Sequence, residues 1–306
     1  MEITLAKIAA FICFIALGAV LRRCGILKGE AFHAISGLVL YVTLPCIIIT
    51  NLNGVKIEGT MLLIAGLGLA TNLLFLLYAF VLTSREKDET YKDFSLLNFG
   101  GFSIGPMAVP FMQAFYPTTG LLTACMFDVG NVVMSAGGTY AIVVGRRQKG
   151  GLWAFFKTIG GKLVRSGPLV AFAIVVGMSS VGLKFPDAVT TVTQVGASAN
   201  TFLCMIMIGE SIDFSMSAKK YWAIVKLLLN RWVVCIVFAL AAYWLLPFEG
   251  EVRTALMLVC FSPIPAMSLI YTAYIKGDIA MAAGLSSLSV VFSLIAMSCV
   301  VLFLQM

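Results

Sequence analysis

The sequence is 306 residues long, 60% hydrophobic and only 11% charged, with a mean hydropathy of +1.01. Soluble domains keep about a quarter of their residues charged, so this composition excludes a soluble protein and indicates a polytopic membrane protein. The net charge of +7 does not indicate nucleic-acid binding, because the lysines and arginines follow a membrane topology described below.

Ten apolar runs are each about long enough to cross 30 Å of hydrocarbon as a helix. They cover approximately residues 4–21, 32–52, 60–82, 94–115, 119–145, 166–183, 188–210, 222–246, 252–275 and 279–304. Charged connectors such as SREKDETYKD and RRQKGG separate several of the runs. We therefore predict an all-α polytopic membrane protein with ten transmembrane helices.

Ten spans divide into two sets of five, and an odd number of crossings per half makes the second half enter from the opposite side. The sequence thus predicts two inverted five-helix repeats, residues 1–150 and 151–306. Between them, residues 152–163 place apolar side chains at helical spacing. We expect this segment to be an amphipathic linker at the cytoplasmic interface.

Glycines and prolines interrupt two of the runs at matching places. The fourth contains GGFSIGPMAVP, and the ninth contains CFSPIPAMS, residues 260–268. An internal proline costs a helix about 3 kcal/mol and a glycine roughly 1 kcal/mol, so both helices should be broken. At 1.5 Å per residue, both breaks fall roughly 14 to 18 Å into the membrane. The alternative is that these are ordinary kinks and that the glycines serve helix packing.

Unpaired backbone at this depth is tolerated where protein or a watery cavity satisfies it, so the two breaks predict the binding site of a transporter. Each crossing proline should begin a half-helix, whose N-terminal dipole attracts a carboxylate. The candidate substrate-binding residues are those at the breaks together with polar or helix-breaking residues in other spans: Ser103, Gly105, Pro106, Ser262, Pro263, Pro265, Pro45, Asn131, Asn200, Thr201 and Arg231.

Two ionisable residues approach the middle of the membrane. Asp128 lies about 13 Å from the outer face in the fifth span, and Arg231 about 14 Å from the inner face in the eighth. A charge there costs at least about 2.5 kcal/mol and needs a partner. The two residues could pair as a structural ion pair. Alternatively, Asp128 carries a coupling proton and Arg231 holds a substrate carboxylate.

The stretch from GGFSIGPMAVPFMQAFYP to FDVGN, followed by CFSPIPAMSLIYTAYIKGD, resembles the auxin efflux carrier family of membrane transport proteins. This resemblance, which spans nearly the whole chain, implies two inverted repeats with interleaved scaffold and transport parts. It also implies helices that cross at their prolines, and elevator-like transport of organic anions such as malonate, malate or an auxin-like acid. We expect such a carrier in the cytoplasmic membrane, either proton-coupled or a uniporter.

Bile-acid sodium symporters are similar in architecture and form the alternative assignment, a sodium-coupled symporter. They place an acidic residue at the ninth-helix crossing, where CFSPIPAMS has none. The expected partners are a small organic anion and membrane lipid, with a homodimer left open, and neither a cofactor nor a metal is expected. The eight cysteines are scattered, which suggests no CxxC metal site or disulfide framework.

An intramembrane enzyme and a membrane sensor are more distant alternatives. The only histidine, His33, directly follows a charged connector, and Asp128 is the only carboxylate at depth, so a catalytic dyad has little support. A sensor would need an output domain, which the ten runs leave no room for. The sequence therefore favours a transporter without enzymatic activity.

The lysines and arginines predict the orientation. One side of the membrane holds only four of them: Lys7, Lys56, Lys184 and Arg253. The connectors on the other side hold fifteen: Arg22, Arg23, Lys28, Arg85, Lys87, Lys92, Arg146, Arg147, Lys149, Lys157, Lys162, Arg165, Lys219, Lys220 and Lys276. Positive charge marks the cytoplasmic side, so both termini should be extracytoplasmic.

A reporter enzyme that is active only in the cytoplasm tests this orientation. Fused after Met306, it should stay inactive in intact cells, whereas the same reporter inserted at Lys87 should be active. An active C-terminal fusion would contradict the orientation.

Overall fold

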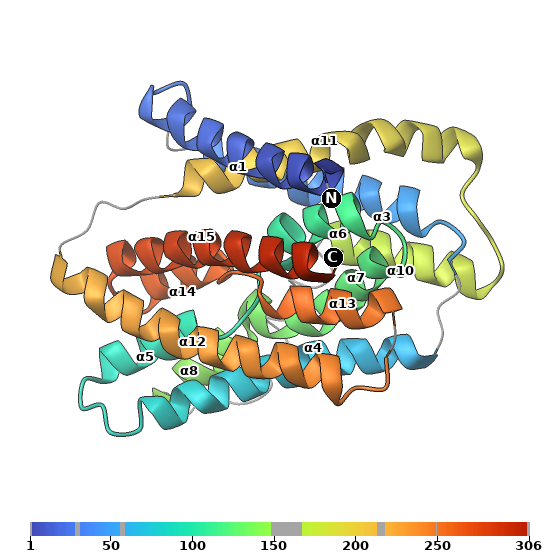
Figure 1. Ribbon diagram of the computed structural model, residues 1–306. Coiled ribbons are helices and arrows are strands. Elements are labelled where there is room, and N and C mark those ends of the chain that lie inside the picture. Colours follow the sequence, from blue (N-terminus) through green and yellow to red (C-terminus); the bar gives the residue numbers. More distant parts are fainter. Residues whose placement is uncertain are drawn as a thin grey trace.

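The computed structural model describes residues 2–27, 31–55, 59–147, 167–212, 218–248 and 250–304, and these residues form helices without any strand (Figure 1). The amphipathic linker predicted at residues 152–163 lies outside the described residues.

The described residues of the first half form two long unbroken helices and three segmented ones. The long helices are α1 (Glu2–Arg23) and α4 (Gly59–Leu82). The first segmented helix consists of α2 (Ala31–Leu38), η1 (Val39–Thr43) and α3 (Leu44–Leu52). The second consists of α5 (Glu89–Phe99), η2 (Ile104–Ala108) and α6 (Val109–Phe115). The third consists of α7 (Thr119–Val133), η3 (Met134–Gly138) and α8 (Thr139–Arg147). The three η segments are single π-helical turns, a form that marks irregular and frequently functional places in helices.

The second half is more regular. It contains the helices α10 (Gly167–Ser180), α11 (Asp187–Ser211), α12 (Ala218–Trp244), α13 (Gly250–Cys260), α14 (Met267–Tyr274) and α15 (Ile279–Leu304). Among its described residues, only the pair α13 and α14 is interrupted by an irregular stretch within a predicted span.

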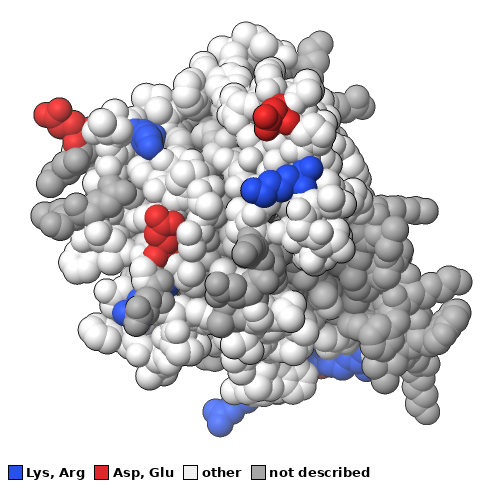
Figure 2. Space-filling view, turned by 90° about the vertical axis from the view of Figure 1, so that its right-hand side faces the viewer, with Lys and Arg blue, Asp and Glu red and all other residues white. Residues whose placement is uncertain are grey.

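Six helical stretches in the described part are long and apolar enough to cross a membrane: 2–23, 31–52, 61–82, 187–211, 220–244 and 279–304. A seventh forms if α5 and the helix from Ile104 to Phe115, which bend by 41°, count as one span. The face seen in Figure 2 carries only scattered charges. The chain is therefore an all-α polytopic membrane protein, whereas ten spans and an inverted repeat stay predictions.

Helices from both halves of the sequence pack together. Helix α11 lies against α1 and α3, while α3 also contacts α10. Helix α7 lies against α4 and α13, and α12 against α13 and α15. Helices α1 and α15 also touch, and the two ends of the chain lie close together in Figure 1.

Glycines allow the closest of these helix contacts. A Cβ atom added to Gly68 of α4 would lie 2.1 Å from the carbonyl oxygen of Phe127, and one on Gly130 of α7 would lie 2.0 Å from that of Ala65. Between α1 and α11, Gly18 and Gly209 have the same relation, with added Cβ atoms 2.4 Å and 2.0 Å from backbone oxygens. Lipid offers no hydrophobic force between helices, so such close backbone contact is what holds them together.

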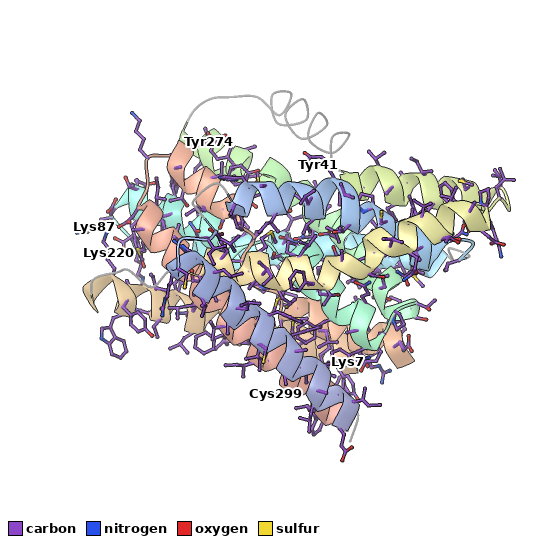
Figure 3. All side chains as sticks on the ribbon, turned by 90° about the horizontal axis from the view of Figure 1, so that it is seen from above. Lys7, Tyr41, Lys87, Lys220, Tyr274 and Cys299 are labelled. Atoms are coloured by element: carbon purple, nitrogen blue, oxygen red, sulfur yellow. The ribbon has the colours of Figure 1, made fainter. Side chains whose placement is uncertain are left out.

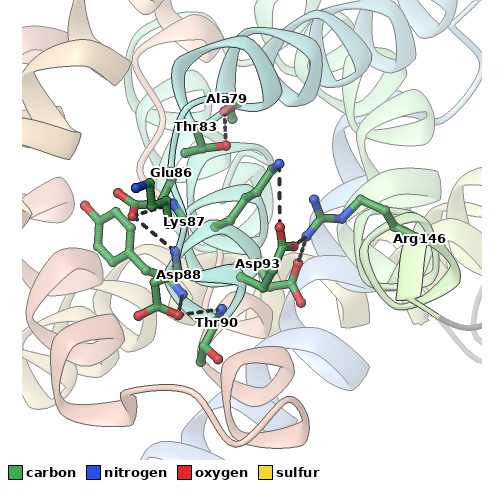
Figure 4. Close-up of polar contacts among 11 residues, drawn as sticks. Ala79, Thr83, Glu86, Lys87, Asp88, Thr90, Asp93 and Arg146 are labelled. Carbon is green, nitrogen blue, oxygen red and sulfur yellow. Dashed lines mark hydrogen bonds and ion pairs between the residues drawn. The ribbon is translucent and has the colours of Figure 1, made fainter.

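Charged side chains stabilise one end of the molecule. Asp88 accepts hydrogen bonds from the backbone N–H groups of Thr90 and Tyr91 at the start of α5, and Arg146 of α8 pairs with Asp93 at 2.6 Å (Figure 4). Lys87 and Lys220, both predicted to be cytoplasmic, lie at the same end, apart from Lys7 (Figure 3).

Lys220 at the start of α12 also pairs with Asp278, which precedes α15, at 2.5 Å. This hydrogen bond lowers the pKa of Asp278 below its usual value. The pair ties the beginnings of two long helices together.

The α4–α7 contact yields a stability prediction. Gly68→Ala should lower the melting temperature by several degrees, because its Cβ would force two helix backbones apart. Gly66→Ala on the same helix is the matched control, since nothing lies within 4 Å of its added Cβ. Thermal unfolding of the purified variants in detergent measures both, and equal melting temperatures would contradict the close contact.

Candidate functional site

The two irregular stretches, residues 100–103 and 261–266, contact each other. The backbone N–H of Ser103 donates to the carbonyl oxygen of Pro263 at 2.9 Å. Gly101, with a φ of 82°, packs so closely on Pro265 that an added Cβ would lie 2.8 Å from the proline Cγ. The sequence-predicted residues Ser103, Pro263 and Pro265 are thus brought together in a crossing of two broken helices.

One arginine binds the carbonyl groups of both breaks. Arg231 of α12 is 2% exposed, and its guanidinium donates to the carbonyl oxygen of Phe99, to that of Gly101 at 2.7 Å and, more weakly, to that of Ser262 at 3.4 Å. Phe99 ends α5, and Ser262 follows the end of α13. The last carbonyls of a helix have no partner within it, so Arg231 satisfies the ends of two helices at once.

Two aromatic rings enclose the same guanidinium. Its Cζ atom lies 5.2 Å from the ring centroid of Phe75 and 5.3 Å from that of Phe102. The faces of aromatic rings attract cations, so they stabilise the charge where water is excluded. Within the described residues Arg231 forms no ion pair with Asp128, so the alternative of a structural ion pair between them is not found here. Its predicted role in holding a substrate carboxylate stays a prediction, although here the guanidinium is directed at carbonyl groups.

Asn131 of α7 holds the first break from the other side. Its amide oxygen accepts from the N–H of Phe102 at 3.1 Å, and its amide nitrogen donates to the carbonyl of the same residue at 2.8 Å. These two hydrogen bonds pair both the backbone N–H and the backbone carbonyl of Phe102, as a neighbouring strand would in a β-sheet. The Asn131 amide also donates to Asp128 at 2.8 Å, and Asn72 of α4 donates to the Asn131 oxygen at 3.2 Å.

Asp128 lines a small cavity next to the crossing. The cavity has a volume of about 30 Å³, enough for roughly one water molecule, and its walls come from α3, the η2–α6 helix, α7 and α10. The lining residues are Leu44, Ile48, Gly105, Val109, Cys125, Asp128, Pro168, Leu169 and Phe172. The structure therefore brings the candidate residues Gly105 and Asp128 together, with an ionisable group at the wall of a cavity.

The prolines do not begin the half-helices as expected. Pro106 lies inside the π-helical turn that starts at Ile104, and Pro263 lies in the irregular stretch before α14, which begins at Met267. This longer break leaves more backbone to satisfy, and the N–H of Ile264 bonds to the hydroxyl of Ser289 on α15 at 3.1 Å. Pro45 does stand at the start of a helix, α3, after the π-helical turn η1.

Asn200 and Thr201 belong to a second polar group on α11. The amide oxygen of Asn200 accepts from Thr43 at 2.7 Å, which joins α11 to η1. The hydroxyl of Thr201 donates to Gln113 of α6 at 3.1 Å, and Gln113 in turn donates to the carbonyl of Ala197 at 3.0 Å. These predicted residues bind neighbouring helices here, and none of them lines the cavity of Asp128.

Sequence reasoning missed several residues at the crossing. Asn98 of α5 donates to Thr272 of α14 at 2.8 Å, joining the two broken spans on the side where α5 ends. Asn72, bound to Asn131, and Ser289, bound to the N–H of Ile264, also lie beside the breaks. The sequence did contain a signal for Asn98, because an asparagine within an apolar run needs a hydrogen-bond partner in the membrane. The sequence alone did not show which residue that partner is.

The comparisons with known proteins bear on the last part of the chain. The model of the Sodium Bile acid symporter family matches residues 200–306, which include Arg231, the second break and α15. No curated protein matches the chain. The match suggests a membrane transporter and favours the bile-acid-symporter type among the candidate functions.

The resemblance to the auxin efflux carrier family is wrong, because the family that matches is that of the sodium bile acid symporters. The elevator-like motion inferred from that resemblance loses its support with it. The glycine and proline pattern on which it rested describes two broken helices, and broken helices that hold a substrate occur in several transporter folds.

The role of Asn131 can be tested by stability. Asn131→Ala should lower the melting temperature more than Asn230→Ala does, because it leaves the N–H and carbonyl of Phe102 buried without partners, at about 1–3 kcal/mol each. Asn230 is the control, since its amide nitrogen donates within α12 to the carbonyl of Lys226 and its amide oxygen accepts from the hydroxyl of Tyr78 at 3.3 Å, so its loss leaves no irregular backbone without partners. Equal effects in thermal unfolding would show that the break does not depend on Asn131.

Proposed function

We propose that the protein is a secondary transporter of the bile-acid-symporter type that moves an organic anion past the crossing of its broken helices. The observation that carries this proposal is the direct contact between two irregular stretches, with a buried cation on one side and a carboxylate on the other. Irregular backbone among membrane helices is found where a substrate or ion passes. The family match over residues 200–306 supports the same function.

The charges at the crossing favour an anion. Arg231 and Asp128 do not touch, but they are linked through Asn131 and the backbone next to Phe102. With Asp128 ionised, the two charges balance. With Asp128 protonated, the positive charge of Arg231 has no counterpart, and an uncompensated charge in a membrane interior is costly. A substrate anion restores the balance, so a proton and an anion are favoured together.

Proton coupling through Asp128 follows from this balance. The carboxylate faces a cavity with room for about one water molecule, through which a proton can reach it. The cavity is too small for a carboxylate metabolite, so binding requires α3, α10 and the η2–α6 helix to separate. In this mechanism the remaining candidate residues at the breaks, among them Ser103, Pro106 and Ser262, line the widened space.

Sodium coupling is the second candidate. The family match favours it, since the family is named for sodium. A multi-pass protein of the cytoplasmic membrane with both termini outside and no catalytic activity is consistent with either mechanism. A homodimer is equally compatible with both.

Transport in proteoliposomes tests the function. The purified full chain should take up labelled carboxylates, drawn from monocarboxylates, dicarboxylates and a bile acid, in preference to amines and sugars. An inward proton gradient should accelerate uptake, whereas a sodium gradient of equal size should not. Preference for amines or sugars would refute the anion proposal, and acceleration by sodium alone would establish the second candidate.

The role of Asp128 has its own variant. Asp128→Asn keeps the shape of the side chain but cannot take up a proton, so the response to the proton gradient should disappear. Asp278→Asn removes a carboxylate away from the crossing, at the ion pair with Lys220, and should keep that response. A proton response retained in Asp128→Asn would exclude this carboxylate as the carrier.

A further inference from the structure

The carbonyl groups bound by Arg231 are those that a cation would use. At broken membrane helices, free carbonyls at half-helix C-termini and in unwound backbone coordinate coupling cations. Phe99 and Gly101 supply such carbonyls from the first break, and Ser262 supplies one from the second. All three accept hydrogen bonds from one guanidinium, Phe99 from its Nη1 atom and Gly101 and Ser262 from its Nη2 atom.

We propose that Arg231 is a tethered cation that takes the place of a free coupling cation at this crossing. The three carbonyl oxygens are its ligands, and the two aromatic rings of Phe75 and Phe102 close the site around it. The positive charge that a symporter of this type would load and release with each cycle is here covalently part of α12. Sodium therefore has no site at the crossing of the wild-type chain.

The other groups near the crossing agree with this assignment. The second break, CFSPIPAMS, has no acidic side chain that could help to bind a free cation. No cluster of three or more acidic, cysteine or histidine residues that could hold a metal ion occurs in the described part of the chain. The carboxylate of Asp128 accepts a hydrogen bond from Asn131 and, within the described residues, forms no ion pair with Arg231. The donor set thus fits a fixed guanidinium better than an exchangeable ion.

Removal of the guanidinium should open the site. Arg231→Ala leaves the carbonyl groups of Phe99, Gly101 and Ser262 directed at an empty space in the protein interior. Carbonyl oxygens are the ligands that hard cations prefer. We expect this variant to bind sodium or free guanidinium, whereas the wild-type protein binds neither there.

Thermal unfolding of the full chain in detergent measures this directly, with sodium chloride or millimolar guanidinium chloride exchanged against choline chloride at constant ionic strength. The wild-type melting temperature should be the same in all salts. Arg231→Ala should melt several degrees lower in choline and regain part of this loss, saturably, in sodium or guanidinium. Arg231→Lys keeps a tethered cation and should not respond.

Arg253→Ala is the matched control. Arg253 also donates to a backbone carbonyl, that of Phe248 at 2.8 Å, and lies over the ring of Tyr243. Its loss should give no saturable response to either cation. A saturable response of the wild-type protein to sodium would overturn the proposal, as would an Arg231→Ala variant that neither cation stabilises.

The inference rests on the proposed function only in calling the replaced ion a coupling cation. The melting measurement requires no transport, so failure of the transport assay and failure of the tethered cation are distinguishable. If Arg231→Ala yields no folded protein, the melting temperature of the wild-type protein in sodium and in choline still tests the proposal, because a saturable rise in sodium would overturn it.

Discussion

The crossing of the two broken helices depends on the contact between Arg231 and the backbone carbonyl groups. A helix that ends inside a membrane leaves its last carbonyl groups without partners, at a cost of several kcal/mol for each unsatisfied group. Water satisfies such groups at a surface, whereas here they bind a guanidinium that is only 2% exposed. Because one planar guanidinium has five N–H donors, it can serve α5 and α13 together. The positions of the two breaks are thereby fixed relative to each other.

Cationic side chains serve helix ends elsewhere in this protein too. Arg22 of α1 donates to the carbonyls of Glu210 and Ile212 at the end of α11, at 2.9 and 3.0 Å. Lys7 donates to the carbonyl of Ala114 at the end of α6. The C-terminus of a helix carries partial negative charge, so a cation there gains both hydrogen bonds and a favourable dipole interaction. Arg231 differs because it binds the terminal carbonyl groups of two helices, α5 and α13, and because it lies away from either end of the bundle.

Much of the architecture could be predicted from the sequence. The length and spacing of the apolar runs predicted helices close to the observed bounds, such as 279–304 for α15, and the glycines and prolines located both breaks. Asn131 and Asp128, both named as candidates from the sequence, lie beside the first break, while the binding and proton-coupling roles given to them stay predictions. These features are local, since each is determined by the physical requirements of a short stretch in lipid.

The partners of these groups could not be predicted in the same way. From the sequence, opposite charges at similar depth suggested a pair between Asp128 and Arg231, but the partners of Arg231 are carbonyl groups, which every residue carries. The family resemblance failed for a related reason. Glycine, proline and serine at a break report that the backbone is irregular, and they do not report which ligand the irregular backbone binds.

The two charges at the crossing differ in what they can do during transport. Arginine side chains stay protonated in proteins. Because Arg231 is also attached to α12, its charge is constant through any transport cycle. Asp128 can gain or lose a proton at its cavity, so its charge is variable. A fixed cation next to a variable anion makes the total charge of the site depend on one proton. Release of that proton restores the internal balance and removes the reason for an anion to stay. In the proposed mechanism, the same two residues thus both attract the substrate and let it go, without any ion other than the proton entering the site.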